Sequence, residues 1–242
     1  MTRSELFELI QLLSAVIAVV GGIVAAYHFL RIKSRHERMA MVGDAFRSVI
    51  ESLASDNEVK RLAGAVLLRR FFNPFTELGI AGTPYADECI KVIAALLREP
   101  GLPVNVQKLL ADSLAYAPNL KDADFQRTDL HDAYLGDRIR QGIDISGADF
   151  FEANLSRASL VGIHARRTVF FRAQLAQAQL RRADLRDADF RDADLQEARF
   201  DEADLLGTRF DGASLAGARF QWAKNLPRAI AEKLDPNFIY PA

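Results

Sequence analysis

The chain has 242 residues, 50% of them hydrophobic and 26% charged, with a formal net charge of -1. This composition provides enough apolar side chains for folded cores and argues against disorder of the whole chain. Because the chain lacks the basic excess typical of nucleic-acid-binding proteins, a nucleic-acid partner is disfavoured. The one cysteine, Cys89, cannot form an intramolecular disulfide, and its apolar helical surroundings predict a buried thiol.

The N-terminal segment, residues 1–34, is predicted to be a transmembrane anchor. Residues 9–30 carry no formal charge, and as a helix rising 1.5 Å per residue they would extend about 33 Å, enough to cross the hydrocarbon core of a bilayer. A cleaved signal peptide is the main alternative. It is disfavoured because only Arg3 precedes the apolar run, against Glu5 and Glu8, and because the run is longer than a signal peptide requires.

Charges beside the apolar run predict its orientation. Arg31, Lys33, Arg35 and Arg38 follow it, which places the body of the protein at the cytoplasmic face of the cell (inner) membrane after a single pass. Small residues recur every four positions in the run and would let a second helix approach closely. They leave open either a homo-oligomer or ordinary small-residue usage, and they are Ser14, Ala18, Gly22 and Ala26.

Residues 35–117 are predicted to form a small α-helical domain. Apolar residues return at three- and four-residue spacing, which predicts helices over 37–54, 56–72, 84–98 and 103–116. Ser55 with Glu58 is interpreted as a capping box, and Thr83 before Pro84 as another helix start. The two helix pairs resemble HEAT-like repeat modules, and a helical spacer covering the end of the next domain is the simpler interpretation.

A five-residue period begins at Leu120. Every fifth position up to Phe220 is Leu, Phe or Ile, except Arg140 and Ala165, and a small residue usually stands two positions earlier. Neither an amphipathic α-helix nor an alternating strand has this period.

The run ADLRDADFRDADLQEARFDEADL (183–205) resembles the A(D/N)LXX signature of pentapeptide-repeat proteins, and the resemblance covers about residues 118–223. It implies an all-β, right-handed, quadrilateral β-helix with four repeats per coil, in which the central residue and the preceding small residue point inward. Stacked coils then share one apolar core. The resemblance also implies a bacterial source.

The departures from the repeat lead to further expectations. Because the period is intact on both sides of Arg140, no net insertion is expected there, and the Arg140 side chain should turn outward rather than be buried unpaired. Ala165 with Ile163 looks like an exchange of large and small core residues. Residues 224–242 are expected to cap the β-helix or to form a dimer contact, through the apolar residues Trp222, Phe238, Ile239 and Tyr240.

One wall of the expected β-helix is the candidate protein-binding surface. If residues twenty apart stack, this wall has Leu130, Phe150, Phe170, Phe190 and Phe210 inside, and Phe151, Val169 and Phe171 outside. Exposed stacked aromatic residues suit a protein contact, either with a partner or with the chain's own helical part. Arginines on adjoining walls extend the candidate site unless they serve only as a solvated ion-pair ladder; they are Arg166, Arg167, Arg181 and Arg182.

These observations predict a non-enzymatic, membrane-anchored scaffold that presents a rigid β-helix to an unknown protein partner. The alternative implied by the family is a DNA mimic that acts on a topoisomerase, which requires a strongly acidic rod. Residues 118–222 contain 15 Lys plus Arg and 18 Asp plus Glu, a net charge of only 15 − 18 = −3. No catalytic residue, cofactor or metal site is predicted, because phosphate loops, nucleophile elbows and metal-ligand spacings are missing from the sequence.

Overall fold

The computed structural model describes residues 37, 40–72, 85–117, 119–136 and 142–232. The chain divides into two compact units, Met1–Ser48 and Val49–Ala242. Several predictions fall outside the described residues: the anchor with Ser14, Ala18, Gly22 and Ala26, the Thr83–Pro84 cap, the direction of Arg140, and the roles of Phe238, Ile239 and Tyr240. Trp222 is described and is 60% exposed. Among the helices that are described, none combines the length and the apolar character needed to cross a membrane.

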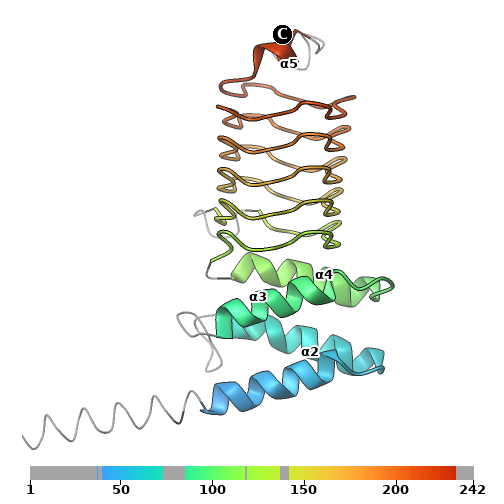
Figure 1. Ribbon diagram of the computed structural model, residues 1–242. Helices are drawn as coiled ribbons and strands as arrows, with labels where there is room; N and C mark the ends of the chain where they lie inside the picture. Colours follow the sequence, from blue (N-terminus) through green and yellow to red (C-terminus); the bar gives the residue numbers. More distant parts are fainter. Residues whose placement is uncertain (1–36, 38–39, 73–84, 118, 137–141, 233–242) are drawn as a thin grey trace, which may run out of the picture. The chain divides into compact units, whose positions relative to one another are not determined.

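The helices lie where the three- and four-residue spacing predicts them. Residues 40–53 are helical, and α2 (Glu58–Phe71), α3 (Tyr85–Leu96) and α4 (Val104–Ser113) follow, with the 3-10 turn η1 (Leu114–Tyr116) directly after α4 (Figure 1). Helices α2 and α4 pack against each other. Their shared interior includes Leu68, Phe71 and Leu110, each fully buried, so the amphipathic spacing reflects a real core.

The start of α2 differs from the predicted capping box. The Asn57 side-chain oxygen accepts a hydrogen bond from the Lys60 backbone N–H at 3.1 Å, which makes Asn57 the N-cap. Ser55 instead accepts from the Asn57 N–H at 3.2 Å, one step before the helix. The prediction that Ser55 caps α2 was therefore wrong, because an asparagine nearer the helix satisfies the free N–H groups equally well.

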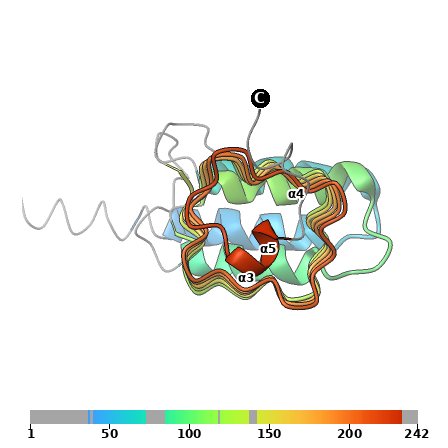
Figure 2. The same cartoon turned by 90° about the horizontal axis from the view of Figure 1, so that it is seen from above.

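From residue 119 the chain winds into stacked coils, which superimpose when viewed along their axis (Figure 2). Within the described coils the backbone forms isolated parallel bridges rather than long strands. The bridges fall into four ladders, which define four walls. Named by one residue each, they are the Val169 wall (Asp124, Asp149, Val169, Asp189, Arg209), the Asn154 wall (Asp129, Asn154, Gln174, Asp194, Ser214), the Gln179 wall (Tyr134, Ser159, Gln179, Arg199, Arg219) and the Asp184 wall (Asp144, His164, Asp184, Asp204, Lys224).

The interior of the coils is a column of apolar side chains, as the five-residue period predicts. Phe150, Phe170 and Phe190 are at most 1% exposed, and their rings stack with centroid separations of 5.3 and 4.7 Å. Ile163 and Ala165 are both fully buried, which confirms the exchange of large and small core residues.

The first described coil is longer than the others. Bridges from Asp124, Asp129 and Tyr134 reach residues 25 positions later, whereas all bridges from Asp144 onward connect residues 20 apart. Phe125, rather than Leu130, therefore stacks under Phe150, at 5.0 Å between ring centroids. The prediction that no insertion had occurred was wrong because one whole extra repeat, between Tyr134 and Asp144, leaves a five-residue period unchanged.

Helix α4 and the two residues that follow α3, Leu97 and Arg98, supply hydrogen-bond partners for the first coil. The Asp129 N–H donates to the Leu97 carbonyl at 2.7 Å, and the buried Gln107 side chain donates to the Asp129 carbonyl at 2.9 Å. Arg98 donates to the carbonyls of Gln126 and Asp124, at 2.8 and 3.0 Å. The unpaired backbone edge that begins a stack of coils is thus covered by helices, which limits edge-to-edge aggregation.

Candidate protein-binding surface

Several Asp and Asn side chains on the walls are held by hydrogen bonds within their own repeat. At the bridge position, Asp149 accepts a hydrogen bond from the Phe151 N–H at 2.9 Å, and Asn154 accepts one from the Ser156 N–H at 3.2 Å. Short Asp and Asn side chains can bond to the backbone two residues later and so stabilise a turn. This local bond explains the preference for Asp or Asn in the repeat signature.

Each turn places its second residue in the left-handed region of backbone conformation. Glu152 has φ 54° and Arg172 has φ 56°, and the Ala153 N–H closes the first of these turns on the Phe150 carbonyl at 3.0 Å. Left-handed backbone costs a non-glycine residue about 1–2 kcal/mol. Hydrogen bonds between coils oppose that cost, as when the Glu152 N–H donates to the Phe171 carbonyl at 3.1 Å.

Side chains at these corners pair with the corner one coil away. Arg182 donates to Glu202 at 2.9 Å, and Arg127 donates to Glu152 at the same distance. The hydrogen bond from Arg182 lowers the pKa of Glu202 below its usual value. Because these groups are exposed, the pairs chiefly balance charge along the corner rather than stabilise the fold.

An apolar patch interrupts this polar surface on the Val169 wall. Phe151 and Phe171 point outward one coil apart and are half-buried, with their ring centroids 5.7 Å apart. Val169 lies between Asp149 and Asp189 on the same wall and is the one aliphatic residue among the described bridge positions. The structure therefore brings together the three apolar residues that the sequence analysis selected, and we call them the Phe171 patch.

Arginines surround the Phe171 patch. The guanidinium carbons of Arg172 and Arg191 lie 5.0 and 5.3 Å from the centre of the Phe171 ring, and that of Arg127 lies 5.8 Å from the Phe151 ring. Cations at these distances are attracted to the face of an aromatic ring. These three arginines were missed from the sequence, although Arg191 stands 20 positions after Phe171 and the repeat length alone could have placed it there.

The four arginines predicted for the site do not form one cluster. Arg166 bonds to Asp184 at 2.7 Å, and Arg182 bonds to Glu202. Arg181 and Arg182 occupy the corner between the Gln179 and Asp184 walls, diagonally opposite the Phe171 corner. Arg166 and Arg181 thus belong to ion pairs away from the Phe171 patch, the latter at 3.9 Å from Asp201.

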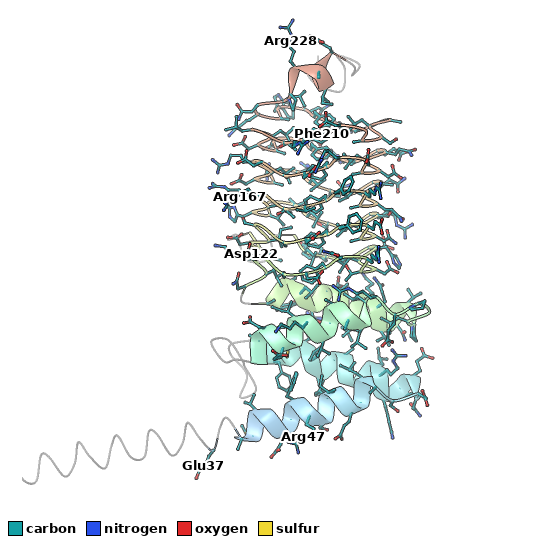
Figure 3. All side chains as sticks on the ribbon, viewed as in Figure 1. Glu37, Arg47, Asp122, Arg167, Phe210 and Arg228 are labelled. Carbon is teal, nitrogen blue, oxygen red and sulfur yellow. The ribbon has the colours of Figure 1, made fainter. Side chains whose placement is uncertain are left out.

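Arg167 is the predicted arginine that borders the Phe171 patch. It stands at the corner that opens the Val169 wall, two residues before Val169, and it is exposed (Figure 3). No acidic partner lies within ion-pair distance of Arg167 among the described residues. In this coil the Val169 wall therefore runs from an exposed cation through Val169 and Phe171 to Arg172.

Neighbouring charges on the wall are paired with each other. Arg191 donates to Asp189, and the Nε–Oδ1 distance is 2.8 Å. This hydrogen bond lowers the pKa of Asp189 and keeps the carboxylate ionised. Within the described ranges, no group of three or more His, Cys, Asp or Glu side chains is arranged to hold a metal ion.

One family model and several solved structures are similar to parts of this chain. The family model described as "Pentapeptide repeat region" matches residues 141–210. No curated protein matches the chain significantly.

Among solved structures, HetL, a pentapeptide repeat protein involved in heterocyst differentiation regulation from the cyanobacterium Nostoc sp. strain PCC 7120, is 29% identical, with a TM-score of 0.37. That match covers 42% of this chain and 55% of HetL, so the chain spans about half of HetL's length. A pentapeptide repeat protein of the Arabidopsis thaliana thylakoid lumen is 28% identical, with a TM-score of 0.24, over 48% of this chain and 73% of that one. QnrB1, a plasmid-mediated fluoroquinolone resistance protein, is 24% identical, with a TM-score of 0.26, over 44% and 67%. The repeat sequence, the four bridge ladders and the family match together identify residues 141–210 as a pentapeptide repeat region.

Proposed function

We propose that this chain is a non-enzymatic interaction protein that binds a protein partner through the Phe171 patch and is held at the cytoplasmic face of a membrane by residues 1–34. The observation that carries the proposal is the outward pair Phe151 and Phe171, 5.7 Å apart beside Val169, on walls that are otherwise mostly polar. Exposed aromatic residues next to arginine are the commonest energetic centres of protein interfaces.

The charges at the patch indicate the chemistry of the partner. Arg167 has no acidic partner among the described residues, and Arg172 lies 3.8 Å from Glu152, a longer separation than a direct hydrogen bond. A partner surface with an apolar side chain flanked by carboxylates would fill the patch and neutralise both cations. Such complementary charges chiefly raise the association rate and the specificity.

Membrane attachment is supported by the sequence of residues 9–30 and by the basic residues that follow it. We also propose that the coils wind in the right-handed sense, as the resemblance to pentapeptide-repeat proteins implies. We expect the chain to remain in the membrane pellet after alkaline extraction. Release into the supernatant would refute the membrane anchor but would not test the proposed interaction surface.

The alternative function, mimicry of DNA toward a topoisomerase, has weaker support. A rod that copies duplex DNA must present dense negative charge, whereas acidic residues here pair with arginines, as in Arg157–Asp132 and Arg186–Asp184. We therefore expect the purified chain to leave the supercoiling activity of DNA gyrase unchanged. Inhibition of that activity would favour the alternative.

Crosslinking in cells tests the interaction surface. A photoreactive amino acid replaces Phe171 in one variant and Arg181 in a control, because both are first residues of a turn and occupy diagonally opposite corners of the stack. We expect a defined protein adduct from position 171 that is weaker or missing from position 181. Equal adducts from both positions, or none from position 171, would overturn the proposal.

A matched pair of substitutions gives a second test. Phe171→Ser should weaken capture of the crosslinked partner at least tenfold, whereas Gln177→Ser, at an exposed corner of the same coil, should leave it unchanged. Unchanged capture by Phe171→Ser would show that the patch does not bind the partner.

A further inference from the structure

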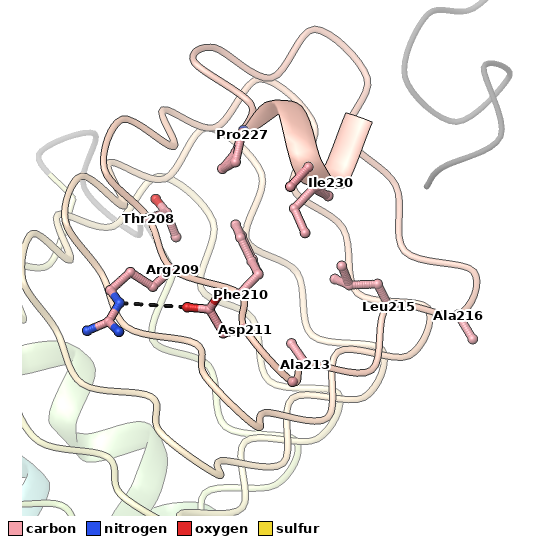
Figure 4. A pocket seen from close by; sticks show the side chains of 11 residues that line it. Thr208, Arg209, Phe210, Asp211, Ala213, Leu215, Ala216, Pro227 and Ile230 are labelled. Atoms are coloured by element: carbon pink, nitrogen blue, oxygen red, sulfur yellow. Dashed lines mark ion pairs between the residues drawn. The ribbon is translucent and has the colours of Figure 1, made fainter. Parts of the chain in front are cut away.

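A pocket lies at the last coil, beneath the short helix α5 (Arg228–Ala231) (Figure 4). Its volume is about 700 Å³, within the range of pockets that hold small ligands or several side chains. The pocket lies on a part of the molecule separate from the Phe171 patch. It is lined by Thr208, Arg209, Phe210, Asp211, Gly212, Ala213, Leu215, Ala216, Pro227, Ala229 and Ile230.

The pocket exists because the core column is incompletely covered at this end. Leu195 and Ala193, one coil earlier, are 0% and 1% exposed. The equivalent residues Leu215 and Ala213 are only half-buried, although Ile230 of α5 packs over this end and is itself 8% exposed. The last coil therefore leaves Leu215 and Ala213 partly exposed, whereas the equivalent core residues of the preceding coil are buried.

Backbone donors at the same edge also lack their usual partners. In the preceding coil, the N–H groups of Phe190, Asp192 and Leu195 donate to carbonyls of the coil that follows, at 2.8–2.9 Å. The corresponding groups of Phe210, Gly212 and Leu215 have no backbone acceptor among the described residues. A segment that covers this edge can therefore both fill the pocket and accept hydrogen bonds.

The chain carries a segment of suitable composition directly after the pocket. Glu232, the last described residue, comes two positions after the pocket residue Ile230. Phe238, Ile239 and Tyr240 follow six to eight residues later. Six extended residues reach about 20 Å, which is sufficient to return across one end of a coil.

We propose that residues 235–242 of the same chain occupy this pocket, with Phe238, Ile239 and Tyr240 covering Leu215 and Phe210. Attachment through a short linker gives the segment an effective concentration on the order of millimolar. This favours the chain's own segment over a second copy of the chain at ordinary protein concentrations.

Disulfide formation tests the occupant. In the full chain with Cys89→Ala, the pair Leu215→Cys and Ile239→Cys places one thiol in the pocket and one in the segment. The control pair is Ser146→Cys and Ile239→Cys, because Ser146 belongs to a corner three coils before the last one, about 14 Å from it along the stack at 4.8 Å per coil. Mixed isotope-labelled and unlabelled protein, oxidised mildly and analysed by peptide mass spectrometry, separates links within a chain from links between chains.

We expect the Leu215 pair to form at least tenfold more disulfide within one chain than the Ser146 pair does. Links between chains would overturn the proposal in favour of a second copy. Free thiols in the Leu215 pair, or equal yields from the two pairs, would overturn it as well.

Amide hydrogen exchange supplies a test without substitutions in the core. Replacing Phe238, Ile239 and Tyr240 together with Ser should accelerate exchange at least tenfold in peptides covering 208–217 and leave 148–157 unchanged. Unchanged exchange over 208–217 would show that the segment does not cover the last coil.

Discussion

The inward and outward directions of neighbouring aromatic residues can be tested by comparing Phe170→Ala with Phe171→Ala. Phe170 is 0% exposed, and its ring stacks between those of Phe150 and Phe190, at 5.3 and 4.7 Å. Phe171 is the next residue in the chain but lies half-buried on the surface. The two variants delete the same atoms one position apart.

The expected losses in unfolding free energy differ clearly. Burial of Phe170 predicts a loss of about 3–5 kcal/mol on truncation to Ala, and loss of two stacked ring pairs places it in the upper half of that range. Phe171 loses one ring contact and its attraction to Arg172 and Arg191. We expect a loss of about 1 kcal/mol for Phe171→Ala.

Urea unfolding followed by circular dichroism measures both losses, with amide exchange over 148–195 to verify that the coils themselves are destabilised. Because coils contact only their neighbours, exchange near Phe170 should change more than exchange in the helices. If Phe171→Ala destabilises the chain as much as Phe170→Ala does, the inward position of every fifth residue is refuted.

Three further predictions follow from the described residues. Gly142→Ala should destabilise the coils more than Gly101→Ala does in urea unfolding, because a Cβ on Gly142 would stand 2.4 Å from a backbone carbonyl oxygen, whereas a Cβ on Gly101 meets nothing within 4 Å; equal losses would contradict this contact. Burial raises the pKa of Cys89 to about 12, so iodoacetamide at pH 8 should modify this thiol only after unfolding, and rapid modification of the folded chain would place it at the surface. The pKa of Asp189 is lowered by its hydrogen bond from Arg191, so this pair stabilises the fold above the unfolded pKa of about 4, and the contribution is lost as pH falls through the lower folded value. Arg191→Gln should therefore reduce the dependence of the urea midpoint on pH below about 4, and an unchanged dependence would exclude the pair as its source.

Much of the coil architecture is encoded in the period of the sequence. The five-residue spacing of large residues identified the buried positions, from Phe125 to Phe220, because only inward side chains must be apolar at every turn. The amphipathic spacing located the helices for a similar reason. The five-residue spacing and the helical spacing both involve residues close in sequence. Each recurs often enough to be recognised even where a single position departs from it.

Other features depend on contacts between residues of different coils, which the five-residue period does not determine. The extra repeat before Asp144 keeps the five-residue spacing but shifts the stacking partner of Phe150 from Leu130 to Phe125. Choice of ion-pair partner was also beyond the sequence, since Asp184 accepts from both Arg166 and Arg186. The pairing depends on which side chains are close enough in the folded coils, and the sequence period does not give those distances.

Phe151, Val169 and Phe171 lie together as the twenty-residue spacing predicts, because all three follow the extra repeat, where that spacing holds. Of the arginines around the patch, Arg167 was predicted from the sequence, whereas Arg127, Arg172 and Arg191 were not. Arg127 contacts Phe151 across the longer first coil, a contact that a uniform spacing of twenty does not predict.

The corner residues with left-handed backbone conformation tolerate many different side chains. Their side chains leave the coil away from the core, and the same turn accepts Arg, Asp, Glu, Gln, Gly and even Trp222 at this position. Mutation can therefore rewrite the recognition face residue by residue while the buried column keeps its composition, so partner choice can diverge between related proteins faster than their scaffold does.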